Sequence, residues 1–278
     1  MARNSCWFFQ KIFTRKKEYA SRTFSDNIHV LTNKFTNWEP SVKIEVGDYG
    51  KINKDTGVFS KIGNIFDDGK TKGTEELKRK THGQDTKLSL ASSNVRAVAF
   101  EAGPNIQLAP LGEIAIQSQY QCSRDYGAIL LMHKPSTTKL EGSLDTLKSA
   151  DFEHLLGMYL VTEVDTCPAY AMYLSAKSSE VVKFMFALSA PIAAAMPGVT
   201  AGGSLGPAWY NEGTVGVYRS GSEPNQTYTT LFQTWSLGKK KDERRDTVRP
   251  GDDISGPDVW AMSVPPWEPL DEDGKEMD

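Results

Sequence analysis

The sequence predicts an α+β protein with two long hairpin regions. Apolar and polar residues alternate with the period of β-strands in two stretches, residues 87–121 and 181–220. Apolar residues also recur at helical spacing near the amino terminus and over 143–160. Strands of this kind together with these helices predict a mixed fold in which antiparallel hairpins dominate.

The composition excludes a protein with several membrane-spanning helices. The 278 residues are 39% hydrophobic and 24% charged, the net charge is -3, and the mean hydropathy is -0.43. The three cysteines, Cys6, Cys122 and Cys167, form no CxxC pair, and their odd number suits a reducing compartment. We therefore expect the chain to reside in the cytoplasm.

The first 24 residues predict a basic amphipathic helix. Residues 8, 9, 12 and 13 are apolar and fall on one helical face. Aromatic residues beside basic ones are typical of helices that bind a membrane surface. A helix docked on a core and a nucleic-acid-binding patch fit the same pattern, but no later segment continues the basic patch. The basic residues are Arg3, Lys11, Arg15, Lys16, Lys17 and Arg22.

The stretch 87–121 predicts a long antiparallel hairpin. Apolar residues occupy alternate positions on both sides of a Gly103-Pro104-Asn105 turn. One apolar face and one polar face suit a β-sandwich and a pore wall equally well. The apolar positions are Leu88, Leu90, Val98, Phe100, Ile106, Leu108, Ile114 and Ile116.

The stretch 181–220 predicts a second hairpin. It holds no charged residue between Phe184 and Asn211, but its prolines and glycines argue against a membrane-spanning helix. Its first arm alternates strongly and its second arm weakly, and each arm could supply roughly the 9–11 residues of a transmembrane strand. The apolar positions include Phe184, Phe186, Leu188, Val215 and Val217.

Shorter elements are predicted between these stretches. Residues 27–45 predict a strand pair, and 47–68 predict short strands around a Lys54–Gly57 turn. Residues 69–87 predict an exposed loop, and 143–160 predict a helix capped by Ser143. A further strand is predicted over 161–176, broken near its proline.

The chain changes character after Leu237. We expect residues 1–237 to form one domain and residues 238–278 to form a charged hinge and a tail. A charged, exposed segment is a common site of proteolysis, and the candidate cleavage residues are Lys239, Lys240, Lys241, Arg244 and Arg245. Trp260 and Trp267 favour a tail that is partly docked over a solvated one.

No catalytic or metal site is predicted. The four histidines are scattered without an HExxH pair, and Gly202–Gly206 lacks the spacing of a nucleophile elbow or a phosphate loop. We therefore expect neither an enzyme nor a cofactor or metal. Cys6, beside Trp7, is a candidate acylation site, although a lone cysteine is also typical of ordinary packing.

The order of these features resembles the gasdermins. The segment GDYGKINKDTGVFSKIGNIFDD at 47–68 follows a basic aromatic amino terminus and precedes two amphipathic hairpins with a helix between them. The likeness covers residues 1–237 and is to the short gasdermin-like proteins of bacteria and filamentous fungi, which include fungal regulators of cell death. The chain departs from mammalian members in having only a short tail where they carry a large inhibitory domain.

The resemblance implies a pore-forming domain, a twisted antiparallel sheet with surrounding helices, that stays inactive until it is triggered. It then binds acidic lipids on the inner leaflet of the plasma membrane, converts both hairpin regions to membrane strands and assembles with copies of itself or with a related chain. The basic residues of the first 24 become lipid contacts, and the apolar positions of both hairpins become membrane-inserting residues. An activating protease is a further expected partner. A soluble β-rich lipid- or ligand-binding protein stays open as the alternative.

Overall fold

The computed structural model describes residues 20–67, 74, 76–83, 85, 87–101, 106–107, 113–148, 150–188, 207–212, 215–239, 247–248 and 258–268. The chain divides into two compact units, which are described separately. The first unit comprises Met1–Gln84, Ser136–Thr166 and Thr229–Asp278, and the second comprises Asp85–Pro135 and Cys167–Tyr228. The described part is rich in mostly antiparallel sheets and has few helices, which agrees with the predicted α+β class.

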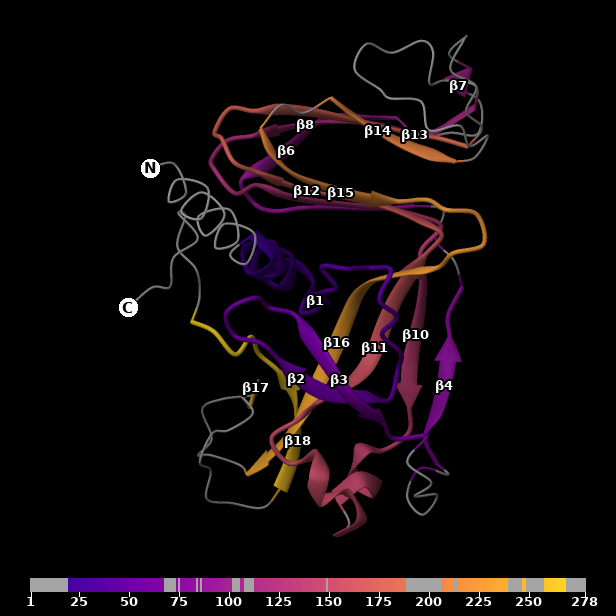
Figure 1. Cartoon of the computed structure of the whole chain (residues 1–278), viewed down its shortest axis with the longest axis vertical. Coiled ribbons are helices and arrows are strands. Elements are labelled where there is room, and N and C mark those ends of the chain that lie inside the picture. The colour runs from indigo at the N-terminus through magenta and orange to yellow at the C-terminus, as the bar shows by residue number, and fades with distance from the viewer. Residues whose placement is uncertain are drawn as a thin grey trace, which may run out of the picture. The chain divides into compact units, whose positions relative to one another are not determined.

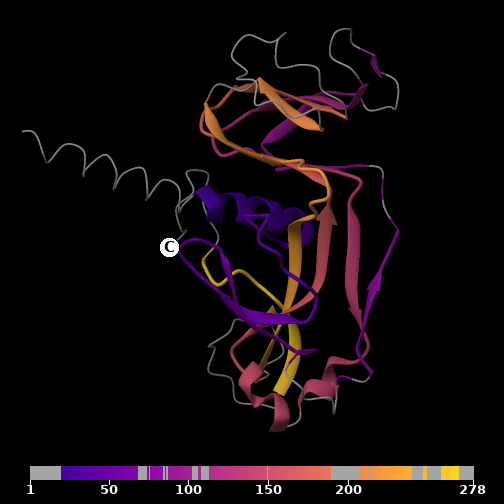
Figure 2. The ribbon, with the colours of Figure 1, turned by 45° about the vertical axis from the view of Figure 1, so that its right-hand side comes forward.

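The first unit is built on a sheet with the order β17-β18-β16-β11-β10-β4 (Figures 1 and 2). In the same sheet β1 pairs with β16, β2 with β11, and β3 with β2. The short β17–β18 pair is parallel. The strands are β1 (Phe35–Thr36), β2 (Asp48–Ile52), β3 (Phe59–Asn64), β4 (Lys78–Thr81), β10 (Ser136–Glu141), β11 (Tyr159–Cys167), β16 (Tyr228–Lys239), β17 (Thr247–Val248) and β18 (Asp258–Ser263).

Residues 20–32 of the first unit form a helix, drawn in indigo in Figure 2. Ala20, Phe24 and Ile28 recur every four residues and are at most 7% exposed, so they form its buried face. The strand pair predicted over 27–45 is therefore wrong except at β1. Its apparent alternation came from Val30 and Leu31, which lie on the helix and are exposed.

The segment 47–68 folds into the β2–β3 hairpin, and the predicted turn at Gly57 is confirmed by its φ of 70°. Asp48 is fully buried and accepts hydrogen bonds from Asn64 Nδ2 at 2.6 Å and from the Glu45 amide at 2.9 Å. Lys61 Nζ lies 2.6 Å from the same carboxylate. A Cβ on Gly50 would overlap the Ser60 carbonyl. These residues of the segment thus have structural roles.

Two other predictions about the first unit need correction. The segment 69–87 is not only a loop, since Lys78–Thr81 pairs with β10 as an exposed edge strand. The segment 143–160 contains two 3₁₀-helices, η1 (Leu144–Lys148) and η2 (Ala150–Leu155), in place of one α-helix. Ser143 Oγ does accept a hydrogen bond from the Asp145 amide at 3.2 Å, as a helix cap would.

The second unit consists of two layered sheets (Figure 1). One has the order β15-β12-β9-β5; the other has the order β14-β13-β8-β6, with β7 paired to β8. The strands are β5 (Lys87–Ala91), β6 (Val95–Glu101), β7 (Ile106–Gln107), β8 (Glu113–Cys122), β9 (Ala128–His133), β12 (Ala169–Ser175), β13 (Val181–Ala187), β14 (Ala208–Glu212) and β15 (Gly216–Gly221). Pro168 separates β11 from β12, as predicted.

Among the described residues, no helix has both the length and the apolar character needed to cross a membrane.

Candidate membrane-inserting sheet

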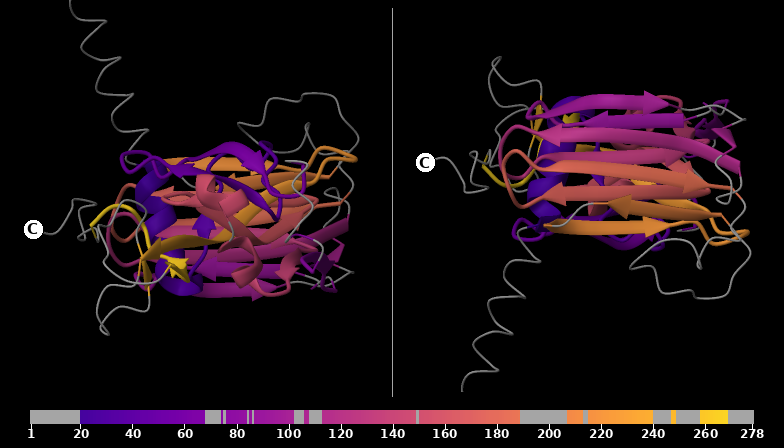
Figure 3. Two further views of the ribbon diagram at one scale, coloured as in Figure 1. Left: turned by 90° about the horizontal axis from the view of Figure 1, so that it is seen from below. Right: turned by 90° about the horizontal axis from the view of Figure 1, so that it is seen from above.

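Both predicted hairpin regions contribute to one sheet of the second unit. We call β14-β13-β8-β6 the flap sheet and β15-β12-β9-β5 the base sheet. The pairs β6–β8 and β13–β14 come from the two hairpin regions, and β8 and β13 pair with each other in antiparallel register, with Phe184 opposite Ser118. The two hairpins are therefore already joined into one antiparallel sheet, seen from above in Figure 3.

The flap sheet has one apolar and one polar face, as the alternation predicted. Its inner face packs a buried cluster against the base sheet, where Phe186 stacks on Trp209 at 4.7 Å and Phe184 meets Tyr173 of β12 at 6.0 Å between ring centroids. On the outer face of β13, the exposed Lys183 lies 3.3 Å from Glu212 of β14. The outer face also forms a hollow lined by Ala99, Gln117, Ser118, Gln119, Lys183, Met185, Tyr210 and Glu212.

The flap and base sheets are connected at one end only (Figure 1). There β5 passes to β6, β8 to β9, β12 to β13, and β14 to β15, each through six residues or fewer. The connections β6–β8 and β13–β14 leave the opposite end of the flap. Each flap strand thus continues a base strand, and the strand order is the same in both sheets.

The central strands keep their register across this corner. Gln121 lies opposite Val181 in the flap, and Ala128 lies opposite Leu174 in the base sheet. Six residues separate these positions on either strand, 122–127 and 175–180. The β8–β9 and β12–β13 segments therefore form one antiparallel ribbon that is folded over on itself.

Both corner loops of this ribbon contain strained backbone. Tyr126 and Ser179 have φ values of 58° and 61°, the left-handed region that non-glycine residues rarely adopt. Such a residue costs of order 1–3 kcal/mol and persists where its surroundings hold it. A straight ribbon would not need either conformation.

Hydrogen bonds hold the corner closed. Glu180 is 7% exposed, and its Oε1 accepts from the Tyr173 hydroxyl at 2.6 Å and from the Val215 amide at 3.0 Å. Burial and the neighbouring carboxylate of Glu180 raise the pKa of Tyr173. A further bond crosses between the sheets, where Ser89 Oγ of the base lies 2.6 Å from Tyr120 Oη of the flap. Sequence patterns did not reveal these bonds, because periodicity shows which face of a strand a residue occupies but not which polar groups on separate segments meet.

Cys122 and Ser175 also meet at the corner. Cys122, the last residue of β8, is fully buried, and its pKa is raised by burial while a hydrogen bond to the Ser175 side chain opposes that rise. Ser175 is the last residue of β12. This contact joins the flap sheet to the base sheet.

Several predicted membrane-inserting residues lie elsewhere than expected. Leu88 and Leu90 are in β5 and Val217 is in β15, so these three belong to the base sheet. Val215 precedes β15, and Val98 of β6 is 53% exposed. The buried positions Ile116, Phe184 and Phe186 lie on the inner face of the flap, and Leu188 packs at its edge. Phe100, Ile106 and Ile114 belong to flap-sheet strands without a described side chain, and Leu108 lies outside the described residues.

The predicted lipid contacts divide into two groups. Arg3, Lys11, Arg15, Lys16 and Lys17 lie outside the described residues, as does Cys6, the candidate acylation site. Arg22 is 5% exposed, and its guanidinium donates to the Lys54 carbonyl at 3.3 Å. In this conformation the helix turns Arg22 toward the β2–β3 hairpin, so its predicted contact with lipid would require this bond to break; the contact stays a prediction.

The described part of the tail is docked, as its tryptophans predicted. β18 pairs with β16, and Trp260 is 7% exposed. Trp267 is 3% exposed and donates a hydrogen bond from Nε1 to Asp26 Oδ1 of the helix at 3.0 Å. Among the candidate cleavage residues, Lys239 belongs to β16 and pairs with Asp258, so it lies within a sheet. The other candidates, Lys240, Lys241, Arg244 and Arg245, lie outside the described residues.

Among the described residues, no group of three or more His, Cys, Asp or Glu side chains is placed to hold a metal ion. In comparisons with known proteins, no family model and no curated protein matches the chain. The gasdermin likeness therefore stays a prediction from the sequence.

Proposed function

We propose that this chain permeabilises membranes by opening its flap sheet into the bilayer, in the manner that its resemblance to the gasdermins implies. The observation that carries the proposal is the one-ended connection between flap and base. Opening at this corner would extend each base strand by a flap strand without any change in strand order. The flap would then present two joined hairpins as one projecting antiparallel sheet.

One flap strand is long enough for a hydrocarbon core about 30 Å thick. β8 has 10 residues, which at roughly 3.4 Å each span about that distance. β6 and β13 have seven residues each and β14 has five, so these strands would have to lengthen on insertion. The inner face would meet the lipid tails, and the outer face with Gln117, Lys183 and Glu212 would meet water. A flap that projects alone leaves the edges of β6 and β14 unpaired. Each unpaired backbone group in lipid costs several kcal/mol. Assembly with further copies pairs those edges, so the active form is an oligomer.

The closed state is held by two sets of contacts. The first is the apolar cluster between flap and base, together with the hydrogen bonds at the corner. As a second restraint on activation we propose the docked tail, whose Trp267 donates a hydrogen bond to Asp26 of the helix 20–32 within the first unit. An activating protease or a related partner chain would act by weakening either set. We place the inactive protein in the cytoplasm and the active one on the acidic inner leaflet of the plasma membrane.

The alternative is a soluble carrier with a lipid or ligand between the sheets. Aromatic side chains occupy that space: Tyr120 contacts Phe184 at 5.9 Å, and His133 contacts Phe186 at 4.9 Å between ring centroids. A carrier would need this cluster to part for its ligand, whereas a flap needs it only as the closed-state contact. The packed space therefore favours the flap.

Dye release tests the proposal. The full chain is added to vesicles containing phosphatidylserine and, separately, to vesicles of phosphatidylcholine alone, and the vesicles are then imaged by negative-stain electron microscopy. We expect release from the acidic vesicles, with ring-shaped assemblies, and little release from the neutral ones. Vesicles that bind the protein yet stay intact under every activating condition, including limited proteolysis, would favour the carrier.

A further inference from the structure

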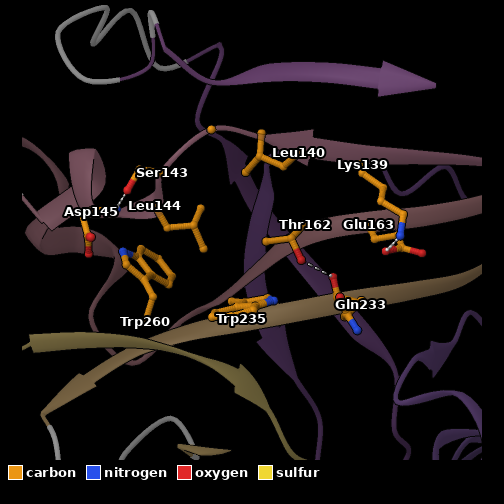
Figure 4. A pocket seen from close by; sticks show the side chains of 11 residues that line it. Lys139, Leu140, Ser143, Leu144, Asp145, Thr162, Glu163, Gln233, Trp235 and Trp260 are labelled. Carbon is orange, nitrogen blue, oxygen red and sulfur yellow. Dashed lines mark hydrogen bonds and ion pairs between the residues drawn. The ribbon is translucent and has the colours of Figure 1, made fainter. Parts of the chain in front are cut away.

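The first unit contains a pocket whose lining residues lie outside the flap strands. The pocket combines two tryptophans with polar groups at both ends. Its volume is about 460 Å³, within the range of roughly 300–1,000 Å³ typical of small-molecule sites. It lies among β10, β11, β16, β18 and η1 (Figure 4). The lining residues are Lys139, Leu140, Gly142, Ser143, Leu144, Asp145, Thr162, Glu163, Gln233, Trp235 and Trp260.

The pocket has an apolar middle. Trp235 of β16 and Trp260 of β18 lie on one side, and Leu140 and Leu144 lie on the other (Figure 4). In the same view Ser143 and Asp145 lie at one end, while Thr162, Gln233 and the Lys139–Glu163 pair lie at the other. Indole faces suit flat, weakly polar surfaces, and the ends suit groups that both donate and accept hydrogen bonds.

The charges of the pocket disfavour an ionic ligand. Glu163 lies 2.5 Å from Lys34 Nζ through one oxygen and 2.9 Å from Lys139 Nζ through the other. Lys34 also pairs with Asp165 at 2.7 Å, so two lysines and two carboxylates balance at this end of the pocket. The balance leaves little net charge there to attract either an organic cation or an anion. The ligand that fits is uncharged.

Two polar groups in the wall have poor partners. Trp260 Nε1 is buried, and no described residue accepts its hydrogen bond. Leaving such a donor unpaired costs about 1–3 kcal/mol. Gln233 Nε2 donates at 3.3 Å only to the Met262 sulfur, which is a weak acceptor. Trp260 Nε1 is covered by the wall, so a ligand would meet the indole ring rather than this donor. A ligand rich in hydroxyl groups would supply an oxygen acceptor for Gln233, and its own protons could reach Asp145 and Thr162.

We propose that this pocket binds a neutral sugar ring. A pyranose has an apolar face of C–H groups for the indole rings and a rim of hydroxyl groups for the polar ends. The proposal goes beyond the membrane function and does not rest on it. Because Trp260 belongs to β18, a bound sugar would contact both the tail strand and the strands β10, β11 and β16, and it would stabilise the docked tail by mass action.

The test uses the full chain, with glucose, galactose, mannose, N-acetylglucosamine and maltose as probes and with choline and adenosine as comparators. Binding is followed by saturation-transfer NMR and by tryptophan fluorescence. We expect at least one sugar to bind, and we expect it to slow amide exchange over 258–263. If no sugar binds at tens of millimolar, or if choline or adenosine binds at this pocket in place of a sugar, the proposal is overturned.

Two variants locate the binding. Trp235→Ala should lower the affinity for the sugar about tenfold or more, which corresponds to about 1.4 kcal/mol of binding free energy. Asp145→Asn lies on the exposed side of η1, so it should not disturb folding, and it should lower the affinity for the sugar severalfold. The matched variant Asp125→Asn in the second unit should leave the affinity unchanged. Circular dichroism confirms folding of each variant. Sugar binding that is unchanged in both pocket variants would place it elsewhere and refute the site.

Discussion

Removing the indole of Trp267 should release the tail. Trp267 is 3% exposed, packs edge-on against Phe35 at 6.2 Å between ring centroids and donates a hydrogen bond to Asp26. A buried tryptophan replaced by alanine typically costs about 3–5 kcal/mol. If this loss falls on docking, the undocked population rises by about 10²- to 4 × 10³-fold, since each 1.4 kcal/mol is tenfold.

Hydrogen exchange and dye release measure this effect together. In Trp267→Ala, amides of 258–263 should exchange faster than in the wild type, and acidic vesicles should leak after a shorter lag. Asp26→Asn, which keeps an oxygen acceptor for the indole, is the matched control and should behave almost as the wild type. Truncation after Leu237 is a poorer test, because it also removes Trp260 from the core of the first unit.

The tail account fails if Trp267→Ala unfolds at a lower temperature but leaks with the wild-type lag. Such a result would assign Trp267 to the stability of the first unit alone. Activation would then depend on a partner chain, and leakage should appear only when that partner is added.

Three further predictions concern lipid binding, insertion and pH. Changing Lys11, Arg15, Lys16 and Lys17 to glutamate should remove co-sedimentation with acidic vesicles, because each basic residue near the surface contributes about 1 kcal/mol of attraction to anionic lipid. Unchanged co-sedimentation would exclude this segment from lipid binding. Ile114→Asp should abolish dye release, because a charge at mid-bilayer costs about 2–4 kcal/mol, while Gln117→Asp on the outer face should not. A folded, fully active Ile114→Asp would contradict the predicted insertion of Ile114 into lipid. Burial lowers the pKa of His29 to about 4 from 6.5, so the unfolded chain binds more protons between these values and stability falls as pH drops through this window. The free energy of unfolding should fall by about 2 kcal/mol from pH 8 to pH 5, which is measured as a lower midpoint of urea unfolding. His29→Gln should reduce this pH dependence of the midpoint, whereas the control His82→Gln, at an exposed site, should not.

Local alternation predicted the faces of the flap sheet. Val182, Phe184 and Phe186 alternate with Lys183 and Met185, and the burial of β13 follows that order. The period of two is fixed by strand geometry, so it needs no knowledge of partners. The same signal could not separate flap from base, because Leu88 in β5 and Val98 in β6 belong to one continuous pattern interrupted only by the short turn between them.

The helix at 20–32 and the corner show why other features were missed. Ile28 and Val30 fit a strand alternation, while Ala20, Phe24 and Ile28 fit a helix, and tertiary burial decided for the helix. The corner depends on pairings such as Ala128 with Leu174, which are far apart in sequence. Glu180 and Ser175 make their contacts across the corner only once these strands are paired.

Opening of the flap at its corner is the central claim, and a single engineered disulfide tests it. Ser175→Cys would place a thiol against the buried Cys122 at the end of the ribbon. In a straight ribbon Cys122 would lie opposite Glu180, five positions from residue 175, or roughly 17 Å away. A disulfide holds its two Cα atoms within about 7 Å, so it is incompatible with the open form.

Dye release is compared between the oxidised and reduced protein, with Cys6 replaced by serine. The control disulfide joins Gln121→Cys to Val181→Cys, which face each other within the flap and stay paired in both forms. Mass spectrometry confirms each bond. We predict that the oxidised Ser175→Cys protein leaves acidic vesicles intact, that reduction restores leakage, and that the control leaks in both states. Equal leakage from oxidised and reduced Ser175→Cys protein would contradict the opening of the flap.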